Sequence, residues 1–207
     1  MLAGILQTHG GLIRSYVSTL GGSAGRLVIS LLYFISLSNS LTIGDFGLFA
    51  AASAAGVVLS RIVSFGFVSP LYRVATVRQR VLGTYYAGYL LAAALSLPVL
   101  VLAGWLLYQL FFVTQVSALT FVLVIASEAL FWRSLEVIVI VNNGLRQFGR
   151  AAILVVAGTV LRALAALAFA LLPDHGLDRW AWYYFGANAV ALSVALAIYL
   201  PRRRLRF

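Results

Sequence analysis

Charged residues are scarce in this sequence. They make up 10% of its 207 residues, whereas a soluble domain carries about 25%. Hydrophobic residues make up 63% of the chain, and the mean hydropathy is +1.02. So little polar surface cannot cover a globule in water. The sequence therefore predicts an all-α integral membrane protein, whose helices satisfy their own backbone hydrogen bonds in lipid.

Cysteine and lysine are both absent. The lack of cysteine excludes disulfides, thiol catalysis and thiolate metal sites. The net charge of +10 comes entirely from fifteen arginines set against five acids. Most of these arginines lie in short gaps between apolar runs, as in cytoplasmic loops, so no nucleic acid partner is expected. The first twenty residues also lack the pattern of a cleaved signal peptide.

The apolar runs predict one bundle over residues 1–207 with six membrane-spanning helices, since each span needs about 20 apolar residues. We expect these spans at residues 16–40, 45–67, 83–108, 115–141, 151–172 and 180–200.

Arginine is distributed unevenly between the loops on the two sides of such a bundle. If the N-terminus is inside, ten arginines fall in inner segments and only Arg179 falls in an outer one. This asymmetry predicts an N-in, C-in topology. Aromatic residues at the predicted span ends, including Trp105, Trp180 and Tyr184, are typical of anchors at the headgroups.

The segment "LTIGDFGLFA" (41–50) lies at the predicted outer turn between the first two spans. Thr42 and Asp45 have the spacing of a helix capping box, in which each side chain binds the other end of the turn. The negative charge of Asp45 also suits the positive end of the following helix.

This segment and the later "SRIVSFGFVSPLYR" resemble the bacterial polysaccharide flippases of the multidrug, oligosaccharidyl-lipid and polysaccharide exporter superfamily. The matching positions are Leu41, Asp45, Phe46, Gly47, Leu48 and Phe49, followed by Ser64, Phe65, Gly66, Phe67 and Arg73. The segment "NNGLRQFGRAAILVVAGTVLRALAALAFAL" is similar to the family's turn between spans 4 and 5 and its helix 5. At the first turn, Ile43, Gly44 and Asp45 replace the family's usual proline and paired acids.

The resemblance implies translocation of an undecaprenyl-diphosphate-linked oligosaccharide across the bacterial inner membrane, for surface or exopolysaccharide synthesis. Family members have two lobes of about six spans each, so this chain corresponds to the N-terminal lobe. We expect a second six-span lobe, supplied by a longer protein or by a homodimer. The longer protein is favoured because the sequence stops directly after the sixth span.

Four arginines fall inside the predicted spans: Arg26, Arg61, Arg133 and Arg162. Arg26 belongs to a polar stripe of the first span, which a lipid-facing helix does not tolerate. The stripe predicts a cavity lined by Arg26, or else a hydrogen-bonded helix interface; its members are Ser15, Thr19, Gly22, Ser23, Arg26, Ser30 and Tyr33. Arg61 lies near the inner end of the second span and can snorkel to the headgroups.

Arg162 and Glu128 lie deeper. Each is about 18–20 Å into its span, at a rise of 1.5 Å per residue. Because their spans are consecutive and antiparallel, the two side chains can form an ion pair. Glu128 could otherwise be a proton or cation site for coupling. Arg133 and Glu136 have the spacing of a structural pair on one helix face.

Three intramembrane arginines, Arg26, Arg61 and Arg162, then face one acid, so the predicted cavity favours an anionic, diphosphate-bearing glycan lipid. We expect no enzyme, no cofactor and no metal, since Asp174, His175 and Asp178 read as a polar turn. Three alternatives stay open: a multidrug exporter of the same superfamily, a non-transporting scaffold of a polysaccharide synthesis complex, and an unrelated six-span transporter.

Overall fold

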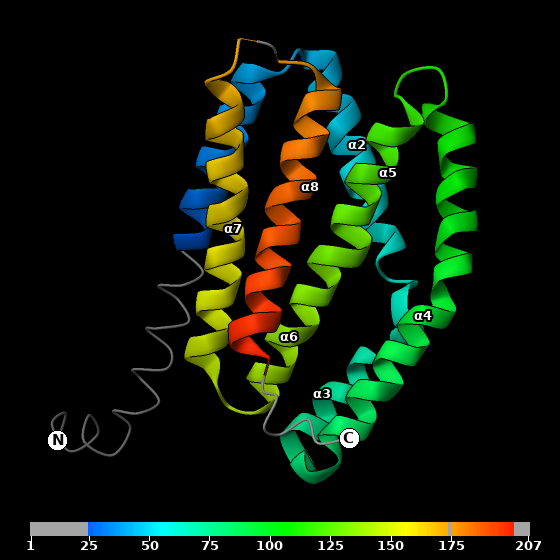
Figure 1. Ribbon diagram of the computed structural model, residues 1–207, viewed down its shortest axis with the longest axis vertical. Coiled ribbons are helices and arrows are strands. Elements are labelled where there is room, and N and C mark those ends of the chain that lie inside the picture. Colours follow the sequence, from blue (N-terminus) through cyan, green and yellow to red (C-terminus); the bar gives the residue numbers. More distant parts are fainter. Residues whose placement is uncertain (1–24, 174, 201–207) are drawn as a thin grey trace, which may run out of the picture.

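The protein is helical throughout the part that the structure describes. The computed structural model describes residues 25–173 and 175–200, and every regular element in these two ranges is a helix (Figure 1). Ser15, Thr19, Gly22 and Ser23 of the expected polar stripe lie outside the described residues. The main helices are residues 25–40, α2 (Ile43–Leu59), α3 (Val68–Val77), α4 (Leu82–Leu107), α5 (Ala118–Ala126), α6 (Arg133–Gly144), α7 (Phe148–Ala170) and α8 (Leu177–Val194).

Short segments of different helical pitch join or extend these helices. The 3₁₀ turns η1 (Val63–Gly66) and η2 (Gln79–Val81) flank α3. The wider π-helical turns are η3 (Tyr108–Phe112), η4 (Ser127–Trp132) and η5 (Ala195–Tyr199). Because η4 connects α5 directly to α6, residues 118–144 form one unbroken helical run.

Within the described ranges, three helices are long and apolar enough to cross a membrane. They are Gln79–Phe112, Phe148–Ala170 and Leu177–Tyr199, and the apolar α2 is shorter. Pro98 lies inside the first of them; such a proline is tolerated in membrane helices because neighbouring groups satisfy the freed carbonyl. These three helices support the prediction that the chain is a membrane protein.

The second expected span, 45–67, is not one helix. Its α-helix ends at Leu59, and the backbone turns through Arg61 and η1 before α3 begins. Phe65 and Gly66 have φ angles of 45° and 77°, the left-handed region that stops an α-helix. The last part of the expected span, residues 60–67, therefore lies outside α2, and α3 forms where the sequence predicted a loop between two spans.

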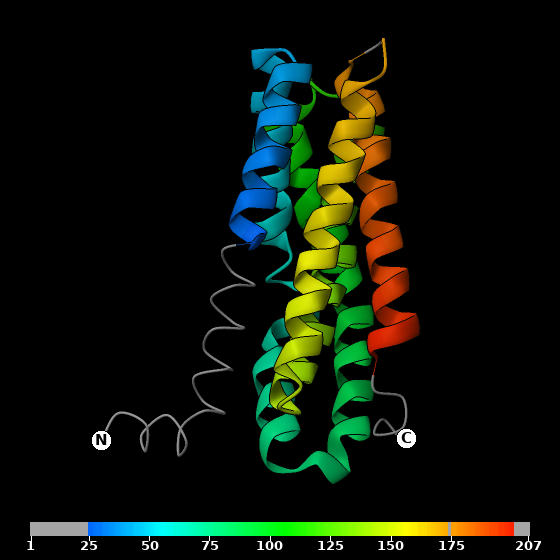
Figure 2. The ribbon, with the colours of Figure 1, turned by 90° about the vertical axis from the view of Figure 1, so that its left-hand side faces the viewer.

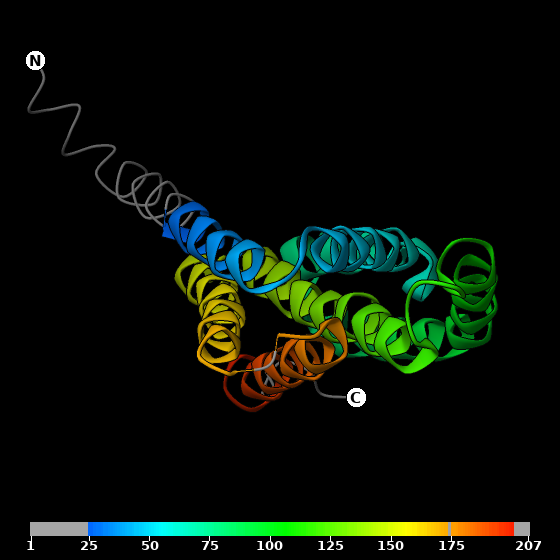
Figure 3. The same ribbon diagram turned by 90° about the horizontal axis from the view of Figure 1, so that it is seen from above.

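The helices lie roughly parallel to the long axis, and the run 118–144 occupies the middle (Figures 1 and 3). Seen from above, residues 25–40 and α2 lie on one side of it, and α7 and α8 lie on the other. α4 stands at the far end of the row, and α3 lies beside the lower part of α4 (Figure 2). α5 therefore contacts both α2 and α8, which brings side chains from distant parts of the sequence together.

The turn between residues 25–40 and α2 forms the predicted cap. The Asp45 amide donates to the Thr42 hydroxyl oxygen over 3.1 Å, and that hydroxyl donates to Asp45 Oδ2 over 2.8 Å. These two hydrogen bonds between Thr42 and Asp45 cap the N-terminus of α2.

The aromatic anchors are only partly where the sequence indicated. Trp105 and Trp182 are each 55% exposed, as anchors require. Trp180 and Tyr184 are instead buried, where they pack edge-on against Phe49 of α2. Residues four apart share a helix face, so the inward face of α8 carries these two rings into the core. The anchor role predicted for them is wrong.

Candidate functional site

A buried ion pair joins the central helical run to α7. Arg162 Nη2 donates to Glu128 Oε2 over 3.3 Å. Glu128 lies in η4 and is only 4% exposed, while the Arg162 side chain is 16% exposed. The pairing matches the depths at which the sequence placed the two residues. An ion pair is required here, because an isolated charge in a low-dielectric interior is costly.

Two more helices supply donors to the same carboxylate. Ser53 of α2 donates to Glu128 Oε1 over 3.0 Å, and the Tyr184 hydroxyl of α8 donates to the same oxygen. Both carboxylate oxygens are therefore engaged, and each donor comes from a different helix. The Glu128 carboxylate thus binds α2, α7 and α8 to the central run.

The Arg162 guanidinium is held on several sides. Its Nε donates to Asn188 Oδ1 over 2.8 Å. Its Cζ lies 3.8 Å from the ring centroid of Trp132 and 4.9 Å from that of Tyr184. The Asn188 side chain is itself held by a hydrogen bond, which its Nδ2 donates to the Tyr184 carbonyl oxygen over 2.7 Å. Aromatic faces attract a cation most strongly where water is excluded, so the two rings help to hold the Arg162 guanidinium inside the bundle.

Two glycines make the close approach possible. A Cβ at Gly56 of α2 would lie 2.8 Å from Glu128 Cβ, and one at Gly158 of α7 would lie 3.0 Å from Trp132. The first contact is shorter than Cβ atoms adopt, and the second requires the Trp132 ring to move by a few tenths of an ångström. The cluster therefore depends on the close approach of the α2 backbone at Gly56 and the α7 backbone at Gly158 to the central run.

Only part of the expected cavity set belongs to this cluster. Tyr33 is half-buried, packs near Trp180 and lies within electrostatic range of Arg162 and Glu128. Arg26 and Arg61 are exposed and lie outside the cluster, while Ser30 is half-buried. Ser23 lies outside the described residues. The structure thus brings Tyr33, Glu128 and Arg162 together, and leaves Arg26 and Arg61 on the surface.

The second predicted pair is also present. Arg133 Nη1 donates to Glu136 Oε2 over 3.0 Å on successive turns of α6. Arg133 is 8% exposed, and its Nε has no hydrogen-bond partner in the described ranges. The pair therefore lies at the edge of the bundle, with Arg133 buried and Glu136 partly exposed.

The loop between α7 and α8 offers no metal site among the residues that the structure describes. Asp178 accepts hydrogen bonds from Ser117, at 3.2 Å, and from Thr120. The His175 ring packs edge-on against Phe169. Asp174 lies outside the described residues. Asp178 therefore joins the start of α8 to the start of α5.

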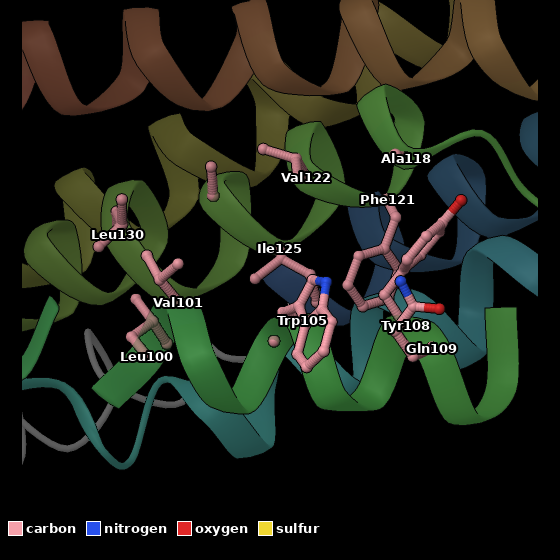
Figure 4. Close-up of a pocket in the computed structure, with 12 residues that line it drawn as sticks. Leu100, Val101, Trp105, Tyr108, Gln109, Ala118, Phe121, Val122, Ile125 and Leu130 are labelled. Atoms are coloured by element: carbon pink, nitrogen blue, oxygen red, sulfur yellow. The ribbon is translucent and has the colours of Figure 1, made fainter. Parts of the chain in front are cut away.

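An apolar hollow of about 420 Å³ lies between α4 and α5 (Figure 4). Trp105 and Leu100 of α4 face Phe121 and Ile125 of α5 across it, and Gln109 lies at one end. Its wall offers almost no hydrogen-bonding groups, so its chemistry suits hydrocarbon rather than a polar ligand.

Sequence reasoning found the two charges of the cluster but missed four of its members: Ser53, Trp132, Tyr184 and Asn188. A usable pattern existed, because Trp180, Tyr184 and Asn188 follow one another at intervals of four along one predicted helix. This spacing places an amide and two aromatic rings on a single face. Nothing in the sequence indicated that Ser53 would meet Glu128, since that contact spans 75 positions.

Comparison with known proteins returned nothing: no protein-family model, no curated protein and no solved structure matches this chain.

Proposed function

We propose that this protein is one six-span lobe of a transporter that flips a lipid-diphosphate-linked oligosaccharide across the bacterial inner membrane. The observation that carries the proposal is the charge arrangement. Each described acid is already bound to groups of the protein, whereas several arginines of the spans and loops have no acid beside them. Such a surplus of positive charge favours an anionic cargo over a cationic drug.

Each acid of the described residues has a partner within the protein. Glu128 binds Arg162, Glu136 binds Arg133, Asp45 binds Thr42, and Asp178 binds Ser117 and Thr120. Arg26 and Arg61 are exposed in the isolated bundle. In a two-lobed transporter these side chains would face the second lobe across the substrate path, with both termini in the cytoplasm.

The six-span count draws support from the packing. Residues 25–40, α2 and the run 118–144 lie alongside the three long apolar helices (Figure 1). We propose that these segments cross the membrane beside the three long helices. The apolar hollow beside α4 adds a place for a hydrocarbon chain.

A flipping assay tests the proposal. The purified protein is reconstituted into liposomes that carry a fluorescent undecaprenyl-diphosphate oligosaccharide in both leaflets, and accessibility of the label to an external quencher is followed over time. We expect faster exchange between leaflets than in protein-free liposomes. We also expect Arg162→Ala to slow exchange more than Arg61→Ala, since Arg61 lies at a helix end where it reaches water.

The second candidate is a non-transporting membrane scaffold of a polysaccharide synthesis complex. It is favoured by the saturation of Glu128, which leaves this acid without an open position for a moving ion. Exchange no faster than in empty liposomes, together with retained binding to partner enzymes, would select the scaffold.

A further inference from the structure

A groove of about 610 Å³ runs along the exposed side of α3, far from the charged cluster. Arg73 and Arg78 line it together with Ser69, Val77 and the ring of Tyr85 from the start of α4. Two cationic side chains and two hydroxyl groups therefore border one hollow.

The groove lies on a helix that is firmly packed against the rest of the bundle. The opposite face of α3 buries Leu71 and Ala75 completely, and Ala75 packs against α6 where a Cβ at Gly144 would lie 2.5 Å away. α3 is thereby fixed to the bundle. Its outward face is amphipathic, with Arg73 beside the exposed Tyr72 and Val77.

Neither Arg73 nor Arg78 is paired with an acid of the described residues. The ion pairs among the described residues are Glu128 with Arg162 and Glu136 with Arg133, so neither Arg73 nor Arg78 takes part in one. Asp45 and Asp178 are engaged in the caps at the opposite end of the bundle. An anion that neutralises Arg73 and Arg78 must therefore come from outside the described chain.

The surroundings indicate where that anion sits. α3 lies at the same end of the bundle as the turn that carries Arg146 and Arg150 (Figures 1 and 2). Val77 lines the groove and is 70% exposed, and Tyr72, next to Arg73 in α3, is 48% exposed. Apolar and aromatic side chains mixed with arginine are typical of the membrane interface, at the level of the headgroups.

We propose that the α3 groove binds the phosphate of an anionic phospholipid headgroup. The guanidinium groups of Arg73 and Arg78 contact the phosphate oxygens, since the planar fork of arginine matches phosphate geometry. The Tyr85 and Ser69 hydroxyls donate to the same group, and Val77 contacts the upper acyl chain. This site goes beyond the proposed function, because it requires only that the chain lies in a membrane.

Native mass spectrometry of the full-length protein in mild detergent tests the site. Phosphatidylglycerol and phosphatidylcholine are titrated separately, and the dissociation constant of the first bound lipid is measured. We expect preference for phosphatidylglycerol, and we expect R73Q/R78Q to weaken its binding by about tenfold or more, because each interfacial arginine contributes about 1 kcal/mol, or roughly fivefold. R73K/R78K keeps the charge but loses the fork, so it should fall between the two.

The matched control is R146Q/R150Q, which removes two exposed arginines from the same end of the bundle but outside the groove. It should change phosphatidylglycerol binding less than twofold. Equal weakening by both double variants would mean diffuse surface charge and would overturn the site. Displacement of the lipid by millimolar glycerol 3-phosphate would show that a free phosphate suffices, which would overturn the lipid assignment. Circular dichroism and gel filtration confirm that each variant folds.

Discussion

Glu128 has four roles that no other residue of the described chain combines. It neutralises Arg162, accepts from Ser53 and Tyr184, and lies where Gly56 comes closest to the central run. A buried pair of this kind contributes little over a well-packed apolar core, but removing one partner leaves the other charge uncompensated. Replacing Glu128 alone should therefore destabilise the bundle strongly.

Glu128→Gln should destabilise the protein by about 3–5 kcal/mol, since Arg162 then stays buried without a counter-charge. The free energy of unfolding is measured by titration with a denaturing detergent. The double variant E128Q/R162Q removes both charges and should recover most of the loss. If E128Q alone unfolds like the wild type, or if the double variant is the least stable of the three, the ion pair is not what holds these helices.

At the scale of the element, small residues determine how closely helices pack. α2 contains three glycines, and they differ in what surrounds them: a Cβ at Gly56 meets Glu128, whereas one at Gly47 meets nothing within 4 Å. The sequence alone does not separate these positions, because both lie in an apolar helix with many alanines.

Gly56→Ala should destabilise the protein by about 1–3 kcal/mol, because the added methyl group overlaps the Glu128 side chain and pushes α2 outward. Gly47→Ala is the matched control in the same helix. It should be neutral or stabilising by up to about 1 kcal/mol, since alanine favours helix more than glycine does. Equal effects of the two substitutions on the unfolding transition would rule out close packing at Gly56.

The contact between α3 and α6 gives a second test at this scale. Gly144→Ala places two Cβ atoms 2.5 Å apart at Ala75, so we expect a loss of about 1–3 kcal/mol from overpacking. Ala75→Gly in the same chain removes the opposing methyl group and should restore part of the stability. A double variant no more stable than G144A would show that the damage lies elsewhere.

At the scale of the whole molecule, arginine marks one end of the bundle. Arg73, Arg78, Arg80, Arg146 and Arg150 lie at the end formed by α3 and the turn before α7, and Arg179 lies at the other (Figure 1). This asymmetry is the basis for the proposed orientation, because arginine-rich loops stay in the cytoplasm.

The absence of cysteine makes the orientation simple to measure. In intact cells, Gln115→Cys in the loop before α5 should react with a membrane-impermeant maleimide, and Arg150→Cys should react only after permeabilisation. Both positions are exposed, so access to the reagent decides the outcome. The reverse pattern of labelling would contradict the proposed topology.

The two-lobe requirement is a further property of the assembly. An exposed Arg26 on an isolated bundle is costly against lipid, so we expect the transporting species to contain a second six-span lobe. Mass measurement in mild detergent, combined with the flipping assay, tests this expectation. A monomer of this chain that flips the labelled lipid unaided would refute it.

The sequence by itself determined the class of the protein and its most costly pair of residues. Low charge and long apolar runs leave only a helical membrane fold, since lipid cannot satisfy an open backbone. The placement of Glu128 and Arg162 followed from helical rise alone, and the Thr42–Asp45 cap followed from local spacing. These inferences succeeded because each depends on neighbours along one helix or across one turn.

Only the tertiary structure decided which side chains complete the cluster and where the second predicted span breaks. Ser53, Tyr184 and Asn188 reach Glu128 and Arg162 because α2 and α8 flank the same central run. Trp180 and Tyr184 fill the core although their sequence position suits an anchor. α2 ends at Leu59, left-handed backbone at Phe65 and Gly66 separates η1 from α3, and α3 packs against α6. Hydropathy records how apolar a residue is, but not which neighbour covers it, and the neighbours are set by packing between helices distant in the chain.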